Sequence, residues 1–233
     1  AVARDGDRLL IRRGILQRRV AAVPLRRVHA ATVIEGPLRQ PLGLCSVRLE
    51  TAGYGREPAA ARTLFPLLRI AEVDARLAEL VPALAGGLDR LERPPIRALR
   101  RYALRGTLAS IAAGIALTVL WPSAWPAIPL LAALGALDGA LRYRNAGWLL
   151  SGERLALRRG ALLRRTLIAR ADRLQDESVA QSPLQRRARL ASLGVTVASG
   201  ASGAVAHLES STAAALLGRL GPAAPARPAP PAA

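Results

Sequence analysis

Residues 6–23 read GDRLLIRRGILQRRVAAV, and residues 152–169 read GERLALRRGALLRRTLIA. These stretches belong to a longer internal repeat, because a shift of 146 residues places residues 6–53 on residues 152–199 without a gap. Of the 48 aligned positions, 16 are identical. Self-similarity at one fixed spacing is typical of a duplicated structural unit. The 233-residue chain is therefore predicted to hold two units of one fold, separated by a connecting segment.

Each unit is predicted to form short strands followed by one helix. Residues 8–13 and 15–23 flank Gly14 and predict a β-hairpin. Residues 45–51 alternate between apolar and polar side chains, which predicts a strand with one buried face. Apolar residues recur at helical spacing in residues 70–80, which predicts an amphipathic helix that closes the unit. The remaining predicted strands are 28–34 and 63–68 in the first unit and 155–159, 162–169 and 193–198 in the second, whose closing helix is predicted at 211–220.

The most apolar part of the chain lies between the two units. Residues 102–121 and 125–141 are almost free of charge and are joined by a turn that contains Trp121 and Trp125. A helix of about 20 residues spans a hydrocarbon layer of about 30 Å. The sequence therefore predicts a transmembrane helical hairpin over residues 102–142. A buried hairpin in a soluble protein is the alternative, but it would need a polar face that these residues lack.

The residues that flank the hairpin predict its orientation. Tryptophan prefers the membrane interface, and arginine side chains reach from a helix end to the head groups. The expected membrane-interface residues are therefore Trp121, Trp125, Arg105 and Arg142, and Asp138 is expected to pair with Arg142. Arginine is dense on both outer flanks and absent from the Trp turn. By the positive-inside rule both units are cytoplasmic and the turn faces outward.

The formal net charge of +18 makes nucleic acid the alternative partner to a membrane. A protein that binds nucleic acid would interleave aromatic side chains with a basic face. Aromatic residues make up only 3% of the chain, and Tyr102, Trp121 and Trp125 are assigned to the hairpin. Membrane lipids are therefore the expected partner, and nucleic acid is not. The alternative is a soluble, arginine-rich nucleic-acid-binding protein with a buried helical hairpin.

No group of residues in the sequence predicts catalysis. The single cysteine, Cys45, excludes an internal disulfide, and its repeat equivalent Ala191 indicates a core position. Neither histidine has a partner at metal-ligand spacing, and the Gly-rich loop at residues 199–203 lacks the lysine of a nucleotide loop. We therefore expect no enzyme, no metal and no cofactor. Because the chain has no methionine, we also expect it to be part of a longer protein.

Three stretches of the chain resemble a known family. Residues 12–28 read RRGILQRRVAAVPLRRV, residues 35–44 read EGPLRQPLGL and residues 47–53 read VRLETAG. Together they resemble the bacterial membrane-flanked domain family, whose soluble unit is a bacterial pleckstrin-homology-like (PH-like) domain. The resemblance implies an integral bacterial membrane protein and does not imply an enzyme. The second unit departs from the pattern, because residues 169–171 read ARA where residues 23–25 read VPL.

The resemblance also implies the fold class. It is α+β, with two PH-like antiparallel barrels, each partly open and capped by a C-terminal helix, on either side of the transmembrane hairpin. The expected domains are a first PH-like domain at 1–84, a basic linker at 85–101, the transmembrane hairpin at 102–142, a second PH-like domain at 147–220 and a disordered Pro/Ala tail at 221–233.

The first hairpin of each unit is the candidate binding site. In eukaryotic PH domains the equivalent hairpin is the usual phosphate-binding loop, so the resemblance implies anionic-lipid binding by the arginines of these hairpins. They are Arg12, Arg13, Arg18, Arg19, Arg158, Arg159, Arg164 and Arg165. Near an anionic membrane surface each such side chain contributes about 1 kcal/mol. The alternative is that the arginines form a solvated sheet face that binds nothing.

The expected function follows from the predicted location at the membrane and from the positive charge of the hairpin arginines. We expect non-enzymatic binding or scaffolding at the bacterial inner (plasma) membrane, in a multi-pass protein with a role in envelope protection. Membrane lipids are the expected partners. A membrane protein or a second copy of the chain is a further expected partner.

Overall fold

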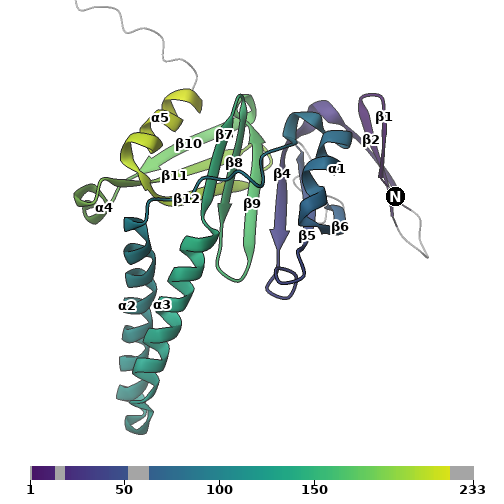
Figure 1. Cartoon of the computed structure of the whole chain (residues 1–233). Helices are drawn as coiled ribbons and strands as arrows, with labels where there is room; N and C mark the ends of the chain where they lie inside the picture. The colour runs from purple at the N-terminus through teal and green to yellow at the C-terminus, as the bar shows by residue number, and fades with distance from the viewer. Residues whose placement is uncertain (1, 14–18, 52–62, 221–233) are drawn as a thin grey trace, which may run out of the picture.

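The computed structural model describes residues 2–13, 19–51 and 63–220 of the chain (Figure 1). The first unit contains β1 (Val2–Asp5), β2 (Arg8–Arg13), β3 (Arg19–Pro24), β4 (Val28–Glu35), β5 (Leu44–Thr51), β6 (Thr63–Arg69) and α1 (Val73–Leu80). Between the units lie α2 (Arg97–Leu120) and α3 (Ala127–Asn145). The second unit contains β7 (Gly147–Ser151), β8 (Arg154–Arg159), β9 (Arg164–Arg170), β10 (Leu174–Ala180), α4 (Pro183–Arg187), β11 (Leu190–Val197), β12 (Ser202–Glu209) and α5 (Ser210–Leu220). The predicted tail at 221–233 lies outside the described residues.

Strands of both units combine in one six-stranded sheet, in the order β6-β5-β4-β9-β8-β7. The units meet where β4 pairs antiparallel with β9, from Ala30 opposite Ala169 to Glu35 opposite Arg164. The other two sheets, β1-β2-β3 and β10-β11-β12, each belong to one unit. This pairing differs from the expected pair of separate barrels, since among the described residues β4 pairs with β9 of the other unit and not with β3.

The six-stranded sheet is shared by two hydrophobic cores. Ala31 and Val33 of β4 and Ile168 of β9 face the core of the first unit. Ala30 and Ala169, which alternate with them along the strands, face the core of the second unit. A strand that is covered on both faces has apolar residues on both faces. The apolar character of β4 and β9 therefore explains why these two strands, and not solvated ones, meet at the centre of the molecule.

Each core is closed by the helix that the sequence predicts at the end of its unit. Val73, Leu77 and Leu80 of α1 are buried in the core of the first unit. Ala213, Leu216 and Leu220 of α5 are buried in the core of the second unit. The predicted alternation of β5 is also confirmed, because Cys45, Val47 and Leu49 all lie in the first core. Strands β1, β7, β10 and β12 were not predicted, and each of them pairs with a neighbouring strand along the chain.

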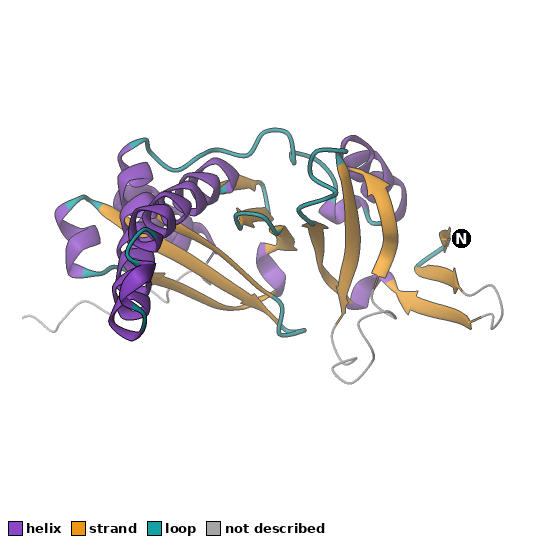
Figure 2. Cartoon of the chain, turned by 90° about the horizontal axis from the view of Figure 1, so that it is seen from below, coloured by secondary structure: helices purple, strands orange, loops and turns teal. Residues whose placement is uncertain are grey.

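The helices α2 and α3 pack side by side and run away from the sheets (Figure 1). Their contact is close because Gly106 faces the backbone of Gly135, and Gly139 faces the backbone of Tyr102 and Ala103. Any side chain at these glycines would collide with the opposite helix. Small residues that bring backbones together are typical of helix pairs in lipid. Seen from below, the two helices overlap the second unit and leave the first unit clear (Figure 2).

The outer surface of the helix pair is apolar and exposed. Exposed side chains include Leu104, Leu108, Ile115, Leu117, Val119, Leu120, Leu130, Leu134 and Leu137. Among the described residues α2 is long and apolar enough to cross a membrane, and almost none of its apolar part is buried. It begins at Arg97, inside the predicted linker, and Ile96 separates it from Pro94 and Pro95. Helix α3 does not meet the same criterion, since Asp138 and two arginines occupy its last turns, and a second membrane pass stays a prediction.

Candidate functional site: an arginine groove at the base of the helix pair

Two arginines lie directly opposite each other in the first hairpin of the second unit. The register of β8 and β9 pairs Arg159 with Arg165, and both residues are exposed. The first unit repeats this arrangement, because β2 and β3 pair Arg13 with Arg19. Like charges directly opposite on a sheet are destabilising. The opposed pair therefore concentrates positive charge at one place on the sheet, where a bound anion would offset the repulsion.

The neighbouring arginine of β8 faces the other way and has partners within the protein. Arg158 Nε donates to Thr166 Oγ1 at 3.1 Å, and Arg158 Nη2 donates to the backbone oxygen of Leu88 at 3.2 Å. Burial lowers the pKa of Arg158. This side chain joins the second unit to the segment that follows α1, so it is not free to bind a lipid.

Arg164 is the centre of a polar cluster at the junction of the two units. Its Nη1 lies 2.9 Å from Glu35 Oε2, and its Nη2 donates to Asn145 Oδ1 at 2.9 Å and to Gln40 Oε1 at 3.4 Å. The Glu35 side chain is only 4% exposed. Breaking a buried ion pair by removing one partner is strongly destabilising, because a buried charge is left alone. Arg164 therefore connects β4, the β4–β5 loop and the end of α3.

The exposed arginine pair borders a groove of about 960 Å³ between the helix pair and the second unit. Arg105 of α2 and Arg142 of α3 line the opposite wall. Arg142 Nε lies 2.6 Å from Asp138 Oδ2, which confirms the predicted i,i+4 pair. Four arginines and one acid thus surround the groove, and its charge is strongly positive.

His207 of β12 forms part of the wall of this groove and is not a source of its charge. Its Nδ1 lies 2.9 Å from Gln185 Nε2, and its ring meets the Tyr102 ring edge-on at 4.9 Å. Burial, followed by the nearby Arg101 and Arg105, lowers the pKa of His207. The imidazole is therefore neutral at pH 7, and it holds the second unit against α2.

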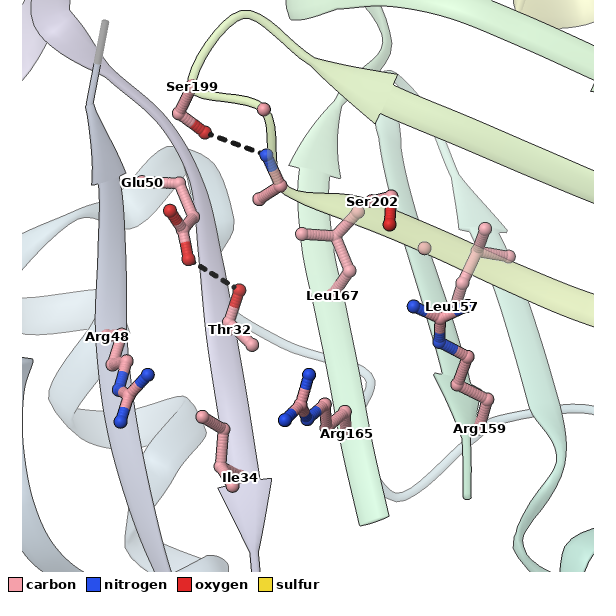
Figure 3. A pocket seen from close by; sticks show the side chains of 13 residues that line it. Thr32, Ile34, Arg48, Glu50, Leu157, Arg159, Arg165, Leu167, Ser199 and Ser202 are labelled. Carbon is pink, nitrogen blue, oxygen red and sulfur yellow. Dashed lines mark hydrogen bonds between the residues drawn. The ribbon is translucent and has the colours of Figure 1, made fainter. Parts of the chain in front are cut away.

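A second, smaller cleft of about 320 Å³ extends from the same arginine pair across the junction (Figure 3). Arg48, Arg165 and Arg159 lie in a row across β5, β9 and β8. Thr32 Oγ1 donates to Glu50 Oε1 at 3.0 Å on one side of the row. Arg48 Nε is buried and has no hydrogen-bond partner among the described residues. The cleft can therefore accept a further acidic group.

Sequence reasoning missed two parts of this smaller cleft. Arg48 lies on the polar face of β5, which the alternation marks as solvent-facing, and residues 199–203 were identified only as a loop. Both border the cleft because β4 and β9 bring the units together. No local pattern near either segment could have predicted that they border one cleft, since Arg48 and Ser199 are 151 residues apart in the sequence.

The other predicted site residues are placed as follows. Arg18 lies outside the described residues, and the side chains of Arg12, Arg13 and Arg19 are not described either, although their backbones form β2 and β3. Trp121 and Trp125 lie at the far end of the helix pair and are 69% and 66% exposed. Of the four predicted arginines in the second unit, the structure brings Arg159 and Arg165 into the groove.

Comparison with known proteins identifies the family of the chain. The family described as "Bacterial PH domain" matches residues 1–85 and 95–224, which include both units. The chain belongs to the bacterial PH domain family. It is similar to UPF0699 transmembrane protein YdbT of Bacillus subtilis (strain 168), with 28% identity over 214 residues. That match includes 91% of the chain, and the chain spans 42% of the length of this relative. No solved structure matches the chain. The resemblance noted in the sequence is therefore confirmed.

Proposed function

We propose that this bacterial PH domain protein is a non-enzymatic, lipid-binding or scaffolding protein of the bacterial inner membrane. In this proposal α2 and α3 cross the membrane as a hairpin, and both bacterial PH units lie in the cytoplasm. The proposal is supported by the exposed apolar surface of the helix pair, by its glycine contact and by the transmembrane relative. A role in envelope protection would follow from binding at this place.

The ligand in this proposal is the phosphate group of an anionic phospholipid. The observation that supports it most directly is the opposed pair of Arg159 and Arg165 beside Arg105 and Arg142. Planar guanidinium groups bind phosphate oxygens in pairs, which suits them for head groups. Arg105 and Arg142 also mark the ends of the apolar part of the helix pair. The groove therefore lies at the depth where head groups meet a membrane-spanning hairpin.

Lipid binding by the full chain tests this proposal. The chain would be held in phosphatidylcholine nanodiscs, and its binding of short-chain phosphatidylglycerol would be measured by calorimetry. The double variant Arg159→Gln/Arg165→Gln removes two charges at about 1 kcal/mol each, so we expect affinity to fall about thirtyfold. Circular dichroism would verify that the variant folds.

The matched control is Arg186→Gln/Arg187→Gln, which removes two exposed arginines from α4, outside the groove. We expect this control to retain its affinity within about twofold, because exposed charges at a distance are screened by salt. Equal losses in the two double variants would mean that binding is diffuse attraction. Equal binding of phosphatidylcholine and phosphatidylglycerol would also contradict the proposal.

A further inference from the structure

Four exposed leucines lie at the tips of two loops. The loop between β4 and β5 exposes Leu38 at 84% and Leu42 at 70%, and the turn between β8 and β9 exposes Leu162 at 61% and Leu163 at 42%. Single exposed leucines are common on protein surfaces and need no explanation. Four on two neighbouring tips form an apolar patch, and such patches mark contact with a protein or a membrane.

The two tips are fixed to each other although they are far apart in the sequence. The side-chain amide of Gln40 donates to the backbone oxygen of Leu162. Gln40 also accepts from Arg164, which forms the buried ion pair with Glu35 at the end of β4. The leucines of both loops therefore belong to one connected surface, the loop-tip patch (Leu38, Leu42, Leu162 and Leu163).

The same polar cluster sets the position of the loop-tip patch relative to the helix pair. Asn145, the last residue of α3, donates from Nδ2 to the backbone oxygen of Ala161 at 2.7 Å. Leu163 borders the arginine groove together with Ala109 and Leu134 of the helix pair. Both loops extend toward the side on which α2 and α3 run away from the sheets (Figure 1). The patch thus lies beside the first apolar turns of the helices.

We propose that the loop-tip patch inserts into the interface of the cytoplasmic leaflet and forms a second membrane contact beside the helix pair. This inference rests on the proposed membrane hairpin and goes beyond it, because it assigns a lipid contact to the first bacterial PH unit. The occupant is the boundary between head groups and acyl chains, since the patch continues the apolar surface of the helices and is bordered by Arg165. Apolar side chains at such a boundary enter the bilayer by about 5–10 Å.

The internal repeat supplies a matched control for this inference. Leu184 is the repeat equivalent of Leu38 and is also strongly exposed, at 63%. It lies in α4, beside the start of α2 and away from the loop-tip patch (Figure 1). Leu38 and Leu184 thus share residue type, repeat position and exposure. They differ in their place relative to the membrane.

Fluorescence of the full chain in vesicles tests the inference. In a Cys45→Ala background, a single cysteine at Leu38, Leu162 or Leu184 would be labelled with an environment-sensitive dye. The vesicles would contain phosphatidylethanolamine and phosphatidylglycerol, with or without nitroxide on the upper part of the acyl chain. We expect blue-shifted emission and about twofold quenching at positions 38 and 162, as for groups about 5–10 Å deep. The dye at position 184 should emit as in water.

A further label distinguishes failure of this inference from failure of the membrane hairpin. Ile115 is 51% exposed on α2, so a dye there should be quenched by nitroxide near the end of the acyl chain. If position 115 is quenched but 38 and 162 behave like 184, the hairpin stands and the inference is overturned. If the dyes at 38 and 162 are blue-shifted without nitroxide quenching, protein covers the patch and the inference is overturned. If position 115 is not quenched, both proposals fail.

Discussion

Cys45 shows how far a single position can be interpreted from the repeat. Its equivalent is Ala191, which predicts a small apolar site, and both residues are buried in the cores of their units. Burial, followed by the charge of Glu35, raises the pKa of the Cys45 thiol to about 11 from an ordinary 9.0. The thiolate is therefore strongly disfavoured in the folded first unit.

The raised pKa of Cys45 predicts a specific dependence of stability on pH. Because the unfolded thiol loses its proton near pH 9.0 and the folded thiol near pH 11, the folded state loses stability as pH rises between these values. A difference of about two pKa units corresponds to about 3 kcal/mol. We expect urea unfolding in mild detergent to show this loss between pH 8 and pH 11. The variant Cys45→Ala should lack this part of the loss, and an identical loss in both proteins would contradict the assignment.

The arginines show where residue-level prediction ends. The sequence predicts the hairpin with Arg158, Arg159, Arg164 and Arg165, and strand alternation divides them between two faces. What the faces contact could not be predicted. Glu35 and Leu88, which hold Arg164 and Arg158, are 129 and 70 residues away in the sequence. Local pattern therefore identified the candidate residues, and only the fold separates those that hold the structure from those that face the groove.

At the scale of elements, the positions of the strands were more predictable than the pairing between them. Sequence pattern and the repeat predicted β2, β3, β4, β5, β6, β8, β9 and β11 and both closing helices, and missed β1, β7, β10 and β12. The pairing of β4 with β9 was missed, because two apolar strands in different units satisfy the same pattern whether each unit closes on itself or shares a sheet. The outer strand β10 is consistent with the shared arrangement. It has Asp176 and Glu177 where β4 has Ala30 and Ala31, and charges at such positions protect an edge strand from further pairing.

The shared sheet predicts which engineered cysteines form a disulfide. Ala30 and Ala169 lie directly opposite each other, so in a Cys45→Ala background the pair Ala30→Cys/Ala169→Cys should oxidise readily. If each unit formed its own barrel, the repeat equivalent of Ala169, which is Val23, would take its place. The pair Ala30→Cys/Val23→Cys is therefore the control. Mass spectrometry after alkylation would measure both disulfides, and preferential oxidation of the control pair would rule out the shared sheet.

At the scale of the whole molecule, the repeat and the charge pattern around the hairpin gave the order of unit, helices and unit. The repeat and the charge pattern could not predict how the helix pair is oriented relative to the second unit. That orientation depends on contacts such as Arg97 with Glu209 and Tyr102 with the backbone oxygen of Ala206. These contacts hold the base of α2 against β12. As a result the arginine groove, the loop-tip patch and the apolar helices all lie on one side of the protein.

The central claim is that the helix pair crosses the inner membrane with both units in the cytoplasm, and cysteine labelling in spheroplasts tests it most directly. In a Cys45→Ala background, Ser123→Cys places a thiol in the exposed turn between α2 and α3, and Leu184→Cys places one on the second unit. We predict that an impermeant maleimide labels position 123 in intact spheroplasts and labels position 184 only after the membrane is permeabilised. Labelling of position 123 only after permeabilisation, or labelling of position 184 in intact spheroplasts, would contradict the account.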